Sequence, residues 1–80
     1  MHFVECAPAT MLAGRLRDRF HEAPIIQGVS ERGLMQVWRN KDSSTHTVTV
    51  TSPQGGMCIV AAGEYLEPVE WELETAGDGT

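Results

Sequence analysis

The chain has 80 residues, of which 41% are hydrophobic and 21% are charged, and it carries a formal net charge of −5. This length suits one small domain, which we expect to span residues 1–80 with a frayed tail at 76–80. No apolar run approaches the roughly 20 residues of a transmembrane helix, and the first residues lack the basic start of a secretory leader. We therefore expect a cytoplasmic protein, or a periplasmic one if a leader has been removed.

Charge is divided unevenly along the chain. Residues 1–41 hold six cations and four acids, a balance of +2, whereas residues 42–80 hold seven acids and no cation, a balance of −7. An acidic end suits recognition of a basic surface, because complementary potentials speed encounter and fix orientation. The same balance makes direct binding to nucleic acid unexpected.

The first predicted element is a helix over residues 8–21. Apolar residues recur every four positions in it and form one stripe, made of Leu12, Leu16 and Phe20. Proline at position 8 is tolerated in a first helical turn, and Pro24 marks the end, because the residue before a proline avoids helical backbone. Residues 2–6 alternate and fit either a short strand or an extended lead-in.

Four further segments have the pattern of antiparallel strands. Each is short and rich in β-branched or apolar residues, and turns rich in Gly, Ser, Asn, Asp or Pro separate them. They are residues 25–29, 34–39, 45–51 and 57–62. The third is the most regular, with His46, Val48 and Val50 on one face and threonines on the other.

Residues 69–75 alternate between apolar and acidic side chains. As a strand they place Val69, Trp71 and Leu73 on one face and Glu70, Glu72 and Glu74 on the other. As a helix the same residues spread around the axis and bury poorly, so the alternation favours a strand. The predicted fold is α+β, with one N-terminal helix packed on an antiparallel meander of four to five strands.

Histidines and cysteines form no recognisable metal or catalytic pattern. Structural zinc needs four ligands in closely spaced pairs, which are missing. Cys58 lies in an apolar stretch that disfavours a thiolate, although His46 falls on a neighbouring predicted strand. We therefore expect no enzyme, no metal and no cofactor.

The two cysteines leave two alternatives open. A bridge between Cys6 and Cys58 would enclose about 50 residues and contribute about 4 kcal/mol in the chain-entropy model, but it needs an oxidising compartment. In a reducing compartment the same residues would be two buried thiols.

The acidic end is the main candidate for a binding site. It is either a solubilising rim or a ladder of carboxylates that docks in a Lys/Arg groove of a nucleic-acid-binding protein. A docking ladder predicts a partner whose affinity falls steeply with added salt. The expected contact residues are Glu67, Glu70, Trp71, Glu72 and Glu74.

The sequence STHTVT at 44–49, followed by GGMCIVAAGE at 55–64, resembles small uncharacterised proteins of alphaproteobacteria and their mobile elements. Such proteins have an early cysteine, a short helix, a Gly-Thr-Trp-Thr strand and a Gly-x-x-Cys-hydrophobic-Ala-x-Gly-Glu segment. The resemblance covers about residues 6–67, with His46 in place of the usual tryptophan and Ser44 in place of glycine. Many of these proteins look exported, which favours a Cys6–Cys58 bridge.

By type rather than by motif, the chain also resembles anti-CRISPR proteins and other phage-encoded inhibitors, which are often small acidic domains. This resemblance implies a non-enzymatic inhibitor that docks on a basic nucleic-acid-binding surface of a defence complex, such as a CRISPR effector subunit. It implies no nucleic-acid or membrane partner, and a monomer or weak dimer. The alternative is an exported structural domain stapled by Cys6–Cys58, and the least favoured reading is a thiol enzyme using Cys58.

Overall fold

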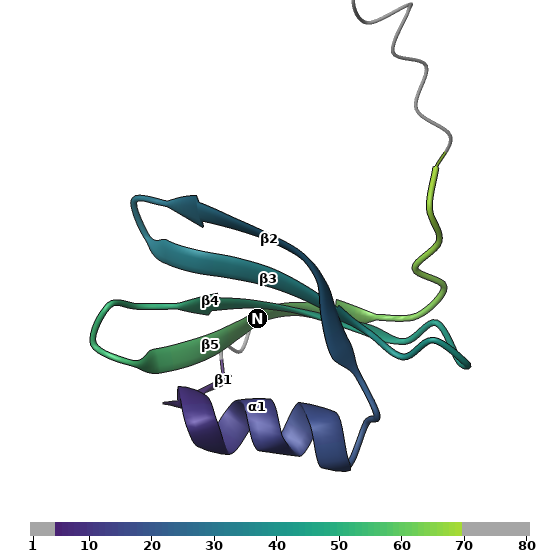
Figure 1. Ribbon diagram of the computed structural model, residues 1–80, viewed down its shortest axis with the longest axis horizontal. Helices are drawn as coiled ribbons and strands as arrows, with labels where there is room; N and C mark the ends of the chain where they lie inside the picture. The colour runs from purple at the N-terminus through teal and green to yellow at the C-terminus, as the bar shows by residue number, and fades with distance from the viewer. Residues whose placement is uncertain (1–4, 70–80) are drawn as a thin grey trace, which may run out of the picture.

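A computed structural model describes residues 5–69, which form one helix and a five-stranded antiparallel sheet (Figure 1). The α+β class predicted from the sequence is confirmed. In chain order the elements are β1 (Glu5–Pro8), α1 (Ala9–Asp18), β2 (Ala23–Ser30), β3 (Gly33–Arg39), β4 (His46–Thr51) and β5 (Gly56–Gly63).

The strand order across the sheet is β1-β5-β4-β3-β2. Strands β2 to β5 follow one another as hairpins, and each lies within two residues of its predicted bounds. The fifth strand, β1, adds to the outer edge of β5, so the sheet has five strands and not four. The predicted strand at 69–75, apart from Val69, and the predicted tail at 76–80 lie outside the described residues.

The helix is shorter at both ends than residues 8–21. Pro8 closes β1 and precedes the first helical residue, where its missing N–H leaves no ladder bond unmade. At the other end the chain turns after Asp18, and the Glu22 N–H donates to the Leu16 carbonyl, 3.0 Å away. His21 then adopts a left-handed backbone conformation with φ of 55°. This turn takes Phe20 out of the apolar stripe, and its side chain is 50% exposed.

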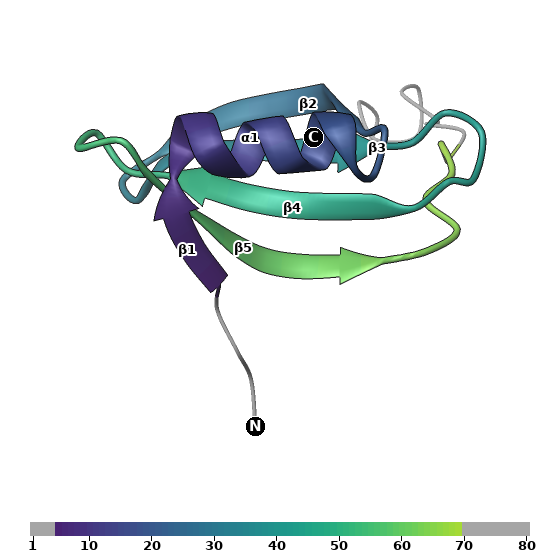
Figure 2. The same ribbon diagram turned by 90° about the horizontal axis from the view of Figure 1, so that it is seen from below.

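The buried core lies between α1 and one face of the sheet (Figure 2). It consists of Leu12 and Leu16 from the helix and Trp38 and Met57 from β3 and β5. The helix begins beside the β4–β5 turn, where the Ala9 N–H donates to the Gly55 carbonyl at 2.9 Å.

The threonine face of β4 is the face that α1 covers. Thr47 is 6% and Thr49 0% exposed, and both hydroxyls have hydrogen-bond partners. Thr49 accepts from the Trp38 indole at 2.9 Å, and Thr47 donates to the buried carboxylate of Glu22 at 2.8 Å. Since side chains alternate along a strand, the valines of β4 lie on the opposite face.

Candidate interaction site

The face of the sheet opposite α1 is largely apolar, and no helix within residues 5–69 covers it; we call it the open face. Its members follow from strand register, because residues next to Trp38 and Thr49 along their strands point away from the helix. Cross-strand pairing places Ile26 beside Val37, Val37 beside Val48, Met35 beside Val50 and Val50 beside Cys58. Most of these side chains are only half-buried. The open face therefore holds apolar area that the described part of the chain leaves in contact with water.

At one end of the open face lies a groove of about 490 Å³, which we call the exit groove. Its walls come from β2, β3 and residues 66–68, which belong to the segment after β5. This segment leaves the end of β5 and runs away from α1 (Figure 1). The lining of the groove is mostly apolar, with one cation and one acid. The lining residues are Ile25, Ile26, Val37, Arg39, Leu66, Glu67 and Pro68.

Arg39 holds the segment after β5 in this position. Its Nε donates to the Leu66 carbonyl at 2.9 Å, and its Nη2 donates to the Ser44 hydroxyl at 3.0 Å. The Leu66 N–H in turn donates to the Ser44 carbonyl at 3.0 Å. Three hydrogen bonds therefore fix where the chain crosses from β5 to the exit groove, although residues 64–69 contain no helix or strand.

Of the predicted contact residues, the structure places only Glu67, whose side chain is exposed at the rim of the exit groove. Glu70, Trp71, Glu72 and Glu74 lie outside the described residues. The division of charge is nonetheless clear from the sequence. Residues 5–69 contain six cations and seven acids, whereas residues 70–80 contain four acids and no cation. The acidic excess therefore belongs to the segment that begins just beyond the exit groove.

Both arginines of α1 are engaged within the molecule. Arg15 forms an ion pair with Glu5 of β1, in which both side chains are partly exposed. The guanidinium carbon of Arg17 lies 6.0 Å from the ring centroid of Trp38, at the limit of a cation–π contact. These cations point to different partners and do not make a single basic stripe.

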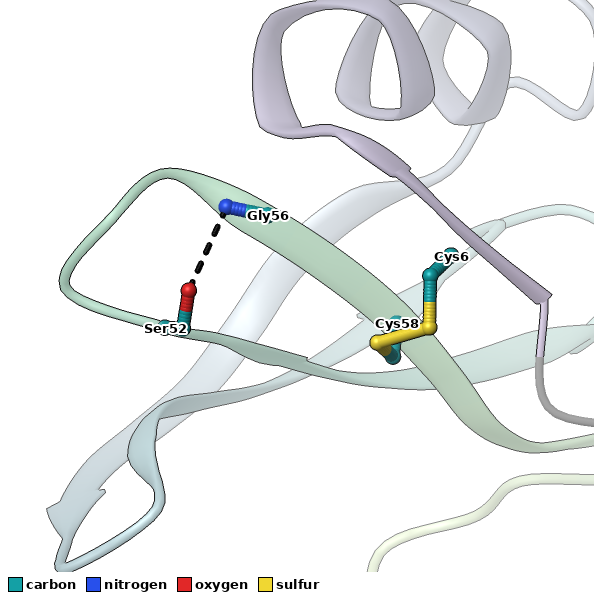
Figure 3. Close-up of a disulfide and its surroundings, with 4 residues drawn as sticks. All are labelled: Cys6, Ser52, Gly56 and Cys58. Atoms are coloured by element: carbon teal, nitrogen blue, oxygen red, sulfur yellow. Dashed lines mark hydrogen bonds between the residues drawn. A yellow bond between two sulfur atoms is a disulfide. The ribbon is translucent and has the colours of Figure 1, made fainter.

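Cys6 and Cys58 lie directly opposite each other in the β1–β5 register and are joined by a disulfide (Figure 3). Their Cα atoms are 4.0 Å apart, and 52 positions separate them in sequence. In the adjacent turn the Gly56 N–H donates to the Ser52 hydroxyl at 3.4 Å. The bridge ties the edge strand β1, and with it the start of α1, to the neighbouring strand β5. It is compatible with the alternative of an exported, stapled domain.

The structure does not bring His46 and Cys58 together. His46 pairs with Gly63 and Cys58 with Val50, so the two positions differ by four residues along β4, roughly 13 Å. The His46 ring instead lies over Gly63, where an added Cβ would come within 3.0 Å of it. Within residues 5–69, no cluster of three or more His, Cys, Asp or Glu could hold a metal ion. No helix in that range is long and apolar enough to span a membrane.

Sequence reasoning did not find the exit groove. The alternation of β4 shows that a second face exists, but Leu66 and Pro68 come from a segment without periodicity.

Comparison of the chain with protein-family models, with curated proteins and with solved structures gave no match.

Proposed function

We propose that this protein is a non-enzymatic binding protein whose acidic C-terminal segment docks on a basic, nucleic-acid-binding surface of another protein. The partner class is a defence complex that binds nucleic acid, such as a CRISPR effector, and the protein acts as a phage- or mobile-element-encoded inhibitor. Its contact residues are Glu67, Glu70, Trp71, Glu72 and Glu74.

One observation carries the proposal: the acidic excess begins where Arg39 anchors the chain. Residues 5–69 are nearly balanced in charge, so the field of the molecule is dominated by the four acids that follow. Hydrogen bonds at Leu66 fix the chain just before that segment, at one end of the sheet. In this proposal α1 has a structural role only, because it packs across one face of the β2–β5 meander.

The experiment measures DNA binding by purified RNA-guided effector complexes, with and without the protein, by gel mobility shift at low and high salt. We expect one effector class to lose DNA binding, and added salt to weaken the inhibition. The double reversal Glu70→Lys with Glu72→Lys should abolish it. The matched control is Glu31→Lys with Asp42→Lys, which makes the same charge change at two exposed turn residues elsewhere. An equal loss of inhibition in both variants would mean that only the net charge of the protein matters, and would overturn the proposal.

The disulfide favours a second candidate function, an exported structural domain stapled by Cys6–Cys58 with no inhibitory role. A bridge of this kind persists in oxidising compartments and is rare in the cytosol. A thiol assay on protein from its natural compartment separates the two candidates. Two titratable thiols would exclude the stapled domain, whereas fully bridged protein that inhibits no effector would favour it.

A further inference from the structure

The exit groove lies immediately before the segment that carries the acidic ladder. Pro68 lines the groove, and Trp71 follows it by three residues, a distance of at most about 10 Å in extended chain. The indole of Trp71 is therefore within reach of Ile26 and Val37 without any rearrangement of the sheet.

The groove has the size and chemistry for an aromatic side chain. Its volume of about 490 Å³ lies within the roughly 300–1,000 Å³ of sites that enclose small ligands. Aliphatic side chains form most of its wall, and Arg39 adds a cation, which is attracted to the face of a tryptophan ring. An indole would cover apolar area that is now exposed, since Ile26 is 59% exposed and Ile25 52%.

The residues that follow the groove alternate in the way such docking needs. In extended backbone Trp71 and Leu73 share one face, and Glu70, Glu72 and Glu74 share the other. If the apolar side chains lie on the open face, every carboxylate points to solvent. The opposite orientation would place carboxylates on Ile26 and Val37, at a high cost in desolvation.

We propose that residues 70–74 dock on the open face of their own sheet, with the Trp71 side chain in the exit groove. Docking covers the exposed aliphatic residues and displays the three glutamates outward as a fixed row. In the docked chain Trp71 positions this row, and the direct contact with the partner is left to the glutamates. It rests on the proposed function only for the role of that row, because the docking itself is measured without a partner.

The test uses the fluorescence of the full chain, which has two tryptophans. Trp38 is 2% exposed and contributes a constant, buried signal, so the difference between wild type and Trp71→Phe reports on Trp71. We expect this difference spectrum to be blue-shifted and quenched by acrylamide several-fold less than a peptide of residues 66–76. Nuclear Overhauser contacts between the Trp71 indole and the Ile26 methyl groups should be present in the wild type. An emission like that of the free peptide, without these contacts, would overturn the proposal.

A matched pair of variants in β2 tests the groove itself. Ile26→Lys places a charge in the groove at a position already 59% exposed, and should red-shift Trp71 to the peptide value. Val29→Lys alters the same strand at a residue that is 85% exposed and outside the groove, and should leave Trp71 unchanged. Equal shifts in both variants would contradict docking in the groove.

The competing occupant of the open face is a second copy of the chain. A second copy predicts that the burial of Trp71 rises with protein concentration and that sedimentation shows a dimer. These two results together would overturn the proposal. Docking within one chain predicts concentration independence. A wild-type protein with a buried Trp71 that inhibits no effector would count against the proposed function alone. A wild-type protein that inhibits an effector but has an exposed Trp71 would count against the docking alone.

Discussion

The indole N–H of Trp38 donates a hydrogen bond of 2.9 Å to the hydroxyl of Thr49, directly beneath α1. Both residues are almost fully buried, at 2% and 0% exposure. A buried indole N–H needs an acceptor, and threonine supplies one while its methyl group packs in the core. This pair accounts for the orientation of β4, in which the threonines face the helix and the valines face outward.

Thr49→Val should lower the free energy of unfolding by about 1–3 kcal/mol, because it keeps the shape of the side chain but leaves the Trp38 N–H buried without an acceptor. Urea denaturation followed by circular dichroism measures the change.

The matched control for this substitution is Thr51→Val, two residues along the same face of β4. The Thr51 hydroxyl is buried and has no hydrogen-bond partner among the described residues. Its removal should therefore leave stability unchanged or raise it. Similar losses at both positions would mean that threonine packing, and not the indole bond, determines the effect of Thr49→Val.

The turn between β2 and β3 depends on a glycine. Gly33 has a φ of 129°, and a Cβ at this position would lie 2.1 Å from the Thr51 carbonyl oxygen. Gly33→Ala should destabilise the protein by about 1–3 kcal/mol, because both the backbone conformation and the contact are unfavourable. The thermal midpoint should fall, and an unchanged midpoint would contradict the close approach of β4.

Gly14→Ala adds the same methyl group at a half-buried position in the interior of α1. A Cβ at this position has no neighbour within 4 Å, so it costs nothing sterically. The substitution should stabilise the protein by about 1 kcal/mol through helix propensity. The two alanine variants thus change the thermal midpoint in opposite directions, and a decrease in both would mean that α1 does not form at this position.

Removal of the disulfide should lower the free energy of unfolding by up to about 4 kcal/mol, the chain-entropy value for a loop of 52 residues. The double variant Cys6→Ser with Cys58→Ser, measured by urea denaturation, gives the change. A reducing agent should lower wild-type stability to the same level and leave the double variant unaffected. If the agent changes both proteins equally, it acts on something other than this bridge.

Most strand positions could be predicted because their causes are local. Alternation and turn residues placed β2 to β5 to within two residues. The end of α1 is different, since the stripe continues to Phe20 in sequence, but the chain turns after Asp18 to bring Glu22 to Thr47. That hydrogen bond joins residues 25 positions apart, so the periodicity of the helix cannot predict it.

The exit groove could not be predicted for a similar reason. It exists because Arg39 holds the carbonyl of Leu66, which is 27 residues away in sequence. Arginine at the end of a strand commonly lies in solvent, and residues 64–69 have no periodicity from which a contact could be inferred. The acidic composition of the next segment was evident from the sequence, whereas the point at which that segment is anchored became evident only from the fold.

Arg39→Lys should release this anchor while keeping the positive charge. Lysine has a single charged nitrogen and cannot bond Leu66 and Ser44 in the fixed fork of a guanidinium. The Leu66 N–H, which donates to Ser44, should therefore exchange with deuterium about tenfold faster, since a hydrogen bond to a charged group contributes about 1.5 kcal/mol or more. Arg32→Lys, in the turn before Gly33 at the opposite end of β3, is the control and should leave this amide unchanged. If exchange of the Leu66 N–H is not faster in Arg39→Lys, Ser44 alone fixes where the acidic segment begins. If exchange is equally fast in both variants, the acceleration is not specific to Arg39.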